Sequence, residues 1–277
     1  RGQLGDARGF VAIAVAIIAL TLGLAEGPTR GWTSAGVLLL IAVGVAAGIV
    51  AFATERRATS PLVPAALFRD RGYLTGTAAI TISYASAGAT VFAIPIVLFM
   101  GDGMNPIATG AIMLSYGVWW LVLPPFTGRL ADRVSPTGML VAGFAFGLVG
   151  CLLASVVPSL QGILGACLSL ALLGIGMAFV VPTANRIAML NIDASLRGEA
   201  SGVNMTSRLL GDLLGIAIVG TLIASSLGQR IPNVGESIDV GSLATGLQAI
   251  WTPVGVLMAL GLVVSAWGSR GSRPQPS

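Results

Sequence analysis

Long apolar runs separated by short polar connections dominate the chain. Most runs hold close to the ~20 residues that a helix needs to cross the roughly 30 Å hydrocarbon core of a bilayer. The uncharged stretch 134–185 is too long for one span, and Pro158 is its natural break. The pattern therefore predicts eight transmembrane helices, at about 10–25, 33–53, 73–100, 107–126, 138–157, 160–181, 197–226 and 246–267.

The polar segments divide the chain into four parts. EGPTRGW (26–32) predicts a turn between the first two spans, and GRLADRVSP (128–136) predicts a loop after the fourth. Residues 61–68 fit a short amphipathic helix on the membrane surface. We expect two connecting transmembrane helices (1–54), a cytoplasmic amphipathic linker (55–72), a six-helix bundle (73–268) and a disordered tail (269–277).

The composition agrees with an all-α polytopic membrane protein. Hydrophobic residues make up 55% of the 277 residues and charged residues only 9%, against about 25% charged in a typical soluble domain. Every basic residue is arginine, and the chain has no histidine. Any proton coupling must therefore use carboxylates, because the usual proton switch of proteins is missing.

The arginines are distributed unequally between the two sides of the predicted membrane. Only Arg30 and Arg230 fall on the side of the loops after the odd-numbered spans. Because cytoplasmic loops carry the excess of basic residues, the opposite side is cytoplasmic and both termini lie there. The cytoplasmic arginines are Arg1, Arg8, Arg56, Arg57, Arg69, Arg71, Arg129, Arg133, Arg186, Arg197, Arg270 and Arg273.

Arg208 and Asp212 stand four residues apart in the seventh predicted span. They share one helix face and can pair, and ionisable groups inside a span point to function. About 16 uncharged residues follow Asp212, roughly 24 Å of helix, which places this carboxylate just inside the cytoplasmic edge of the bilayer. Two interpretations remain open: a compensated pair that anchors the helix end, or a cytoplasmic gate that the pair or the protonation of Asp212 controls.

The sequence lacks the residue patterns that several classes of chemistry need. The chain has no Walker-type loop for a nucleotide, no Ser, Cys or His constellation for hydrolysis, and no carboxylate–histidine cluster for a metal. Cys151 and Cys167 lie in apolar runs and read as packing residues. We expect no enzyme, no cofactor, no metal and no nucleic-acid partner, but a solute pathway that is driven, if at all, by a gradient.

Aromatic and polar residues within the spans are candidates for lining a cavity that holds the solute, although they could equally face lipid or the membrane interface. The cavity candidates are Tyr84, Phe92, Tyr116, Trp119, Trp120 and Asn204. Glu26 is a remote candidate for a proton site, and interface anchoring suits its position better. For Gly174, Gly176, Gly211 and Gly215 we favour close helix packing over a functional role.

The loop GRLADR resembles the motif G-x-x-x-D-R-x-G-R-R/K of the major facilitator superfamily. Gly128, Asp132 and Arg133 match, whereas residues 135–137 replace the final glycine and basic residues. Two spans, a basic loop and six further spans are similar to the fourteen-helix drug:proton antiporter branch. EGPTRGW and the segment RGEASGVNMTSRLLGDLLGIAIVGT (197–221) are similar to segments of that branch.

This resemblance implies that the chain corresponds to helices seven to fourteen, with six preceding helices missing; the first residue is not methionine. It also implies two inverted three-helix repeats, formed by spans three to five and six to eight, and transport by alternating access. By this resemblance the chain is part of a proton-coupled exporter of hydrophobic or cationic small molecules in the plasma membrane. Its partners would be the missing six-helix half and the bilayer. The alternative is an incomplete, non-transporting membrane scaffold.

Overall fold

The computed structural model describes residues 3–55, 64, 66–98, 104–131, 133–156, 163–226 and 243–269, and the regular structure within these ranges is helical. The fold class predicted from the hydrophobic pattern is thereby confirmed. The elements are α1 (Gln3–Arg30), α2 (Ala35–Glu55), the 3-10 helix η1 (Leu67–Arg69), α3 (Arg71–Ile96), α4 (Pro106–Val122), α5 (Pro124–Ala131), α6 (Pro136–Val156), α7 (Ile163–Met189), the 3-10 helix η4 (Ala194–Leu196), α8 (Arg197–Ser226) and α9 (Leu243–Ser269).

The number of spans agrees with the hydrophobic pattern. Seven of the described helices are long and apolar enough to cross a membrane. The bent pair α4–α5 passes the same test as one unit, which makes eight. Helices suit a bilayer because they satisfy their own backbone hydrogen bonds, which the hydrocarbon cannot do.

The first predicted span continues further than expected, into the segment predicted to turn. Helix α1 continues through Pro28 to Arg30, and the chain reverses at Gly31, whose φ of 84° suits glycine. The reversal thus falls within the predicted turn at 26–32, near the C-terminal end of that segment.

The sixth predicted span also ends later, because α7 continues past Val181 to Met189 with Pro182 inside it. Proline has no N–H, so the carbonyl of Ala178 loses its bond within the helix. The Thr127 hydroxyl of α5 donates to that carbonyl at 2.9 Å. A neighbouring helix thus satisfies the freed group, and the helix persists far enough to carry Asn185.

The fourth span is broken rather than ended by its two prolines. Pro124 begins α5, which is inclined by 41° to α4. The backbone N–H groups of Phe126 and Thr127 both bond to the carbonyl of Leu123 at 2.9 Å, so the hydrogen-bond ladder restarts there. The predicted loop at 128–136 therefore begins as a helix, which contains Gly128 and Arg129.

Other predicted segments fall partly or wholly outside the described residues. The surface helix at 61–68 is represented by Pro64 and by residues 66–68, where the chain enters the 3-10 helix η1 with Leu67 buried. The break at Pro158 and the tail beyond Ser269 are not described.

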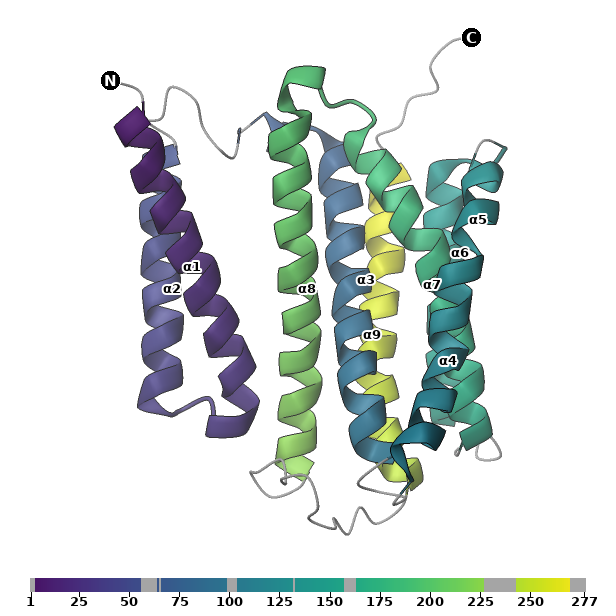
Figure 1. Ribbon diagram of the computed structural model, residues 1–277. Helices are drawn as coiled ribbons and strands as arrows, with labels where there is room; N and C mark the ends of the chain where they lie inside the picture. Colours follow the sequence, from purple (N-terminus) through teal and green to yellow (C-terminus); the bar gives the residue numbers. More distant parts are fainter. Residues whose placement is uncertain are drawn as a thin grey trace.

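The six spans from α3 to α9 form one bundle, with α3 and α7 packed together at its centre (Figure 1). Helix α8 packs on α3 as α4 packs on α7, and α9 packs on α3 as α6 packs on α7. Exchanging α3–α4–α6 with α7–α8–α9 therefore reproduces the contacts. Since α3 and α7 run in opposite directions, the arrangement has the form of two inverted repeats.

Small residues allow the helices to approach at their backbones. A Cβ atom on Gly211 or Gly215 of α8 would collide with the backbone carbonyls of Thr81 and Ala85 on α3. Helices in lipid associate through such close packing, because burial from water does not drive them together. The packing role that we preferred for these two glycines is what the structure shows.

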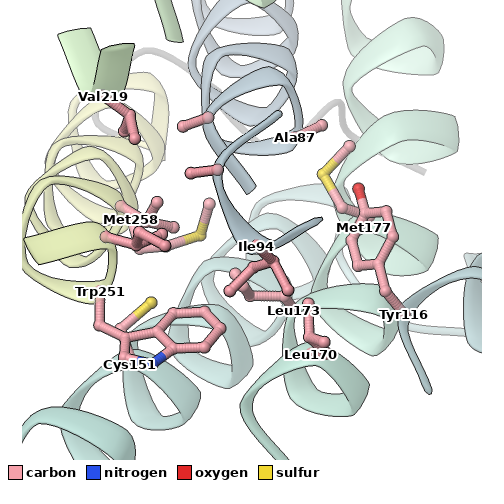
Figure 2. Close-up of a cluster of buried hydrophobic side chains, with 14 of the residues drawn as sticks. Ala87, Ile94, Tyr116, Cys151, Leu170, Leu173, Met177, Val219, Trp251 and Met258 are labelled. Atoms are coloured by element: carbon pink, nitrogen blue, oxygen red, sulfur yellow. The ribbon is translucent and has the colours of Figure 1, made fainter. Parts of the chain in front are cut away.

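The apolar core lies among α3, α6, α7 and α9. Trp251, Phe144 and Ile94 are fully buried in it. Cys151 packs into the same cluster as a free thiol, near Trp251 (Figure 2). Tyr116 lies at the edge of this cluster beside Met177, where the core meets the polar residues described below.

The hairpin α1–α2 stands outside the bundle, beside α8 (Figure 1). It packs through α1: Pro28 would meet a Cβ atom on Gly220 at 3.1 Å. The Trp32 indole N–H donates to the Thr221 hydroxyl at 2.8 Å, at the hairpin turn. The hairpin is thus an addition to the six-helix bundle.

We predict that Gly215→Ala destabilises the fold relative to Gly202→Ala, although both lie in α8. A methyl group at Gly202 meets open space, whereas at Gly215 it meets the Ala85 carbonyl. Both variants gain the ~1 kcal/mol of alanine helix propensity, and overpacking costs the first about 1–3 kcal/mol. Thermal unfolding in detergent, followed by labelling of the buried Cys151 thiol, measures the difference. Equal melting temperatures would contradict the proposed close contact.

Candidate intramembrane polar site

Three aromatic rings meet between α3 and α4. Tyr116 and Trp120 stand one turn apart on α4, with ring centroids separated by 5.9 Å. Tyr84 of α3 meets Trp120 edge-on, with ring centroids 6.2 Å apart. Three of the six cavity candidates therefore lie together, and they present flat apolar surfaces next to polar groups.

Arg208 extends from α8 over this aromatic group. The centre of its guanidinium lies 5.5 Å from the centroid of the Tyr84 ring, a cation–π arrangement. Its Nη2 donates to Oδ1 of Asn185 on α7 at 2.6 Å. The buried Nε has no hydrogen-bond partner among the described residues. One side chain of α8 thus contacts both α3 and α7.

The predicted ion pair between Arg208 and Asp212 is not formed, although the structure describes both side chains. The guanidinium has turned to Asn185 and Tyr84 on neighbouring helices instead. Asn185 lies beyond the predicted end of the sixth span at residue 181, and the extension of α7 to Met189 brings it into reach. Asn185 stands four residues after Val181. Had the sixth span been continued past Pro182, the sequence would have placed Asn185 on that helix.

Asp212 lies against Gly88 of α3. A Cβ atom at Gly88 would collide with the backbone carbonyl of Asp212 and would lie 2.7 Å from its Oδ1, so glycine lets α3 approach α8 at this point. Tyr84 and Asp212 lie close enough to Tyr116 to interact electrostatically with its hydroxyl. Asp212 is half-buried, and it accepts no hydrogen bond from the residues that the structure describes.

Several buried polar atoms of α3, α4 and α8 have no hydrogen-bond partner among the described residues. The Tyr116 hydroxyl, the Thr77 hydroxyl and both polar atoms of the Asn204 amide lack hydrogen bonds within the described part of the chain. Tyr116 and Asn204 are only 4% and 3% exposed. Unpaired buried groups cost stability, so they mark positions where function or a further ligand can explain them.

The remaining candidates lie elsewhere. Trp119 is 38% exposed on the surface of the bundle. Phe92 lies beside Gly220 of α8, near the hairpin contact. Glu26 pairs with Arg30 at 3.1 Å within α1, an arrangement that suits an interface anchor. The structure does not bring these three residues to the aromatic group.

The loop-motif residues lie at one end of the bundle. Gly128 is exposed on α5, and Arg133 is exposed in the turn that precedes α6. Asp132, the central acid of the motif, lies outside the described residues. Thr127 attaches this segment to α7 through its bond to the Ala178 carbonyl.

A bundle of inverted helical repeats with charged and aromatic side chains at its centre is the architecture of a membrane transport protein. Residues 4–216 match the family described as Major Facilitator Superfamily. The chain therefore belongs to the Major Facilitator Superfamily.

Curated relatives narrow the comparison. The tetracenomycin C resistance and export protein of Streptomyces glaucescens is 30% identical over 228 residues, covering 82% of this chain and 42% of the relative. The multidrug resistance protein Stp of Mycobacterium tuberculosis H37Rv is 27% identical over 83% of the chain and 43% of the relative. The quinolone resistance protein NorB of Staphylococcus aureus MRSA252 is 23% identical over 91% and 52%. The chain spans about half the length of these relatives.

We predict opposite outcomes for two Tyr→Phe variants. The Tyr73 hydroxyl donates to the Ala200 carbonyl at 3.1 Å, whereas the Tyr116 hydroxyl is buried without a partner. Tyr73→Phe should cost about 1 kcal/mol, and Tyr116→Phe should leave the free energy of unfolding unchanged or raise it. Thermal unfolding of both variants side by side is the measurement. A loss at Tyr116 as large as that at Tyr73 would show that its hydroxyl has a partner.

Proposed function

We propose that the chain is the C-terminal part of a proton-coupled secondary transporter that exports hydrophobic or cationic small molecules. The observation that carries this proposal is the match to the superfamily over residues 4–216, together with relatives named for the export of, or resistance to, antibiotics. No cofactor is needed if a proton gradient supplies the driving force.

The intramembrane site supports a solute of this kind. The half-buried rings of Tyr84 and Trp120 are of the kind on which a flat apolar molecule or a cation can rest. Asp212 is the carboxylate beside them, and it can hold either a proton or the positive charge of a solute. In a chain without histidine, carboxylates are the groups available for exchanging a proton.

The missing partner in this proposal is a preceding six-helix half. Alternating access moves two halves of a transporter around a site between them, and this chain spans about half of its relatives' length. We therefore propose that the chain acts together with that half. If the longer protein fails to export, the competing function, a non-transporting membrane scaffold, is favoured instead.

We propose the plasma membrane as the location, with both termini cytoplasmic. Helix α1 begins and α9 ends at the same end of the molecule, where α3 and α8 begin and α7 ends (Figure 1). This end carries Arg71, Arg129, Arg186 and Arg197. Such an excess of arginine supports a cytoplasmic position for this end.

We predict that Asp212→Asn in the protein with its upstream half lowers drug export at least about tenfold, a loss of roughly 1.4 kcal/mol in coupling. The variant should still reach the membrane in normal amount. Resistance of a host strain and efflux of a fluorescent cationic dye are the measurements, with Asp193→Asn at the exposed end of η4 as the control. The 277-residue chain alone should export nothing.

Unchanged export by Asp212→Asn would show that Asp212 has no part in transport. A wild-type longer protein that moves no dye against a proton gradient, and confers no resistance, would favour the scaffold.

The orientation has its own test. In a variant without native cysteines, Gly31→Cys should react with a membrane-impermeant maleimide added to intact cells. Arg133→Cys should react only after permeabilisation, because the two positions lie at opposite ends of the bundle. The reverse pattern would overturn the proposed orientation.

A further inference from the structure

We infer that Asn185 is a positioning residue, which holds the Arg208 side chain away from Asp212 and so keeps this carboxylate free of its neighbouring counter-charge. The inference deepens the proposed function and rests on it for the role of Asp212 in export.

The Asn185 amide has a single useful orientation. Its Nδ2 donates to the Val181 carbonyl at 2.9 Å, one turn back on α7. Its Oδ1 is thereby directed away from the helix as an acceptor, and Nη2 of Arg208 donates to it at 2.6 Å. The prepositioned amide therefore competes for the guanidinium without first losing side-chain freedom.

Arg208 has a second acceptor within reach, which it does not use. Asp212 lies four residues along the same helix, the spacing at which arginine and aspartate pair. A bond to an ionised carboxylate is roughly twice as strong as one to a neutral acceptor. The Tyr84 face adds about 0.5–2 kcal/mol on the Asn185 side. The two positions of Arg208 are thus closely balanced, and the unpartnered Nε leaves capacity for a change.

The choice between the two acceptors depends on helix position. Arg208 and Asp212 move together because both belong to α8, whereas Asn185 belongs to α7. Both helices pack on α3, and the Arg208 side chain bridges them over Tyr84. A shift of α8 relative to α7 lengthens the Asn185 contact and returns the guanidinium to Asp212. The packing of the bundle thereby decides whether Asp212 is available to a proton or a solute cation.

Among the residues that the structure describes, the other groups around Asp212 do not provide a substitute for Arg208. Helix α3 offers Tyr84 and Gly88, and α4 offers Tyr116, none of which carries a positive charge. Helix α1 packs on α8 as well, but the Arg30 guanidinium is paired with Glu26. The position of Arg208 is therefore the feature that sets the charge balance at Asp212.

A double-mutant cycle on the 277-residue chain tests the inference without transport. Asp212→Asn and Asn185→Leu are made singly and together, and thermal unfolding is followed in detergent by labelling of Cys151. In the wild-type background, Asp212→Asn should leave Tm unchanged or raise it, since Asp212 has no hydrogen-bond or ion-pair partner among the described residues. In the Asn185→Leu background the same change should lower Tm by about 2–4 °C, because Arg208 then pairs with Asp212.

Two further variants exclude a general weakening of the fold. Asn185→Asp keeps an acceptor oxygen and should restore the wild-type response to Asp212→Asn. Asn204→Leu removes a buried amide that has no partner and should not alter that response. Additive effects of Asn185→Leu and Asp212→Asn, or coupling of equal size with Asn204→Leu, would overturn the inference.

Export by the longer protein supplies the functional readout. Asn185→Leu should lower export several-fold, and adding Arg208→Gln should recover part of it, because no guanidinium then remains to neutralise Asp212. A further loss in the double variant would contradict the positioning role. If the wild-type longer protein exports nothing, the proposed function fails, while the thermal cycle still decides whether Asn185 holds Arg208.

Discussion

Contact between helix backbones is the interaction on which the rest of this structure depends. In hydrocarbon, helices gain little from hiding apolar side chains from one another, so close packing must hold them together. Gly211 and Gly215 let α8 rest on the backbone of α3, and Gly88 lets α3 approach α8 in return. The same closeness brings Asp212, Tyr84 and Arg208 within range of each other. Packing and site are therefore one arrangement.

Proline shapes the bundle through the backbone groups that it leaves unbonded. Pro182 has no N–H to bond the Ala178 carbonyl. The Thr127 hydroxyl donates to this carbonyl in its place, so α7 continues past Pro182. The helix then continues to Asn185 and supplies the acceptor for Arg208. The hydrogen bond from Thr127 on α5 thus makes the Asn185 acceptor available to Arg208 on α8.

The polar site draws on both repeats. Tyr84, Tyr116 and Trp120 belong to the first, and Asn185, Arg208 and Asp212 belong to the second. Any movement of one repeat against the other must change these contacts, because the side chains come from two helices of each repeat. This is the physical requirement for coupling a solute or proton at the site to the direction in which a transporter opens.

By itself, the sequence determined the properties that depend on local composition: an all-helical membrane fold, eight spans when the bent pair is counted as one, and glycines used for packing. It also identified Tyr84, Tyr116, Trp120 and the charges of α8 as candidates. The extension of α7, the bend before α5 and the partner of Arg208 came only from the tertiary structure. Apolar content determines whether a segment crosses the membrane, whereas the group that satisfies a freed carbonyl or a buried guanidinium depends on the register of a neighbouring helix.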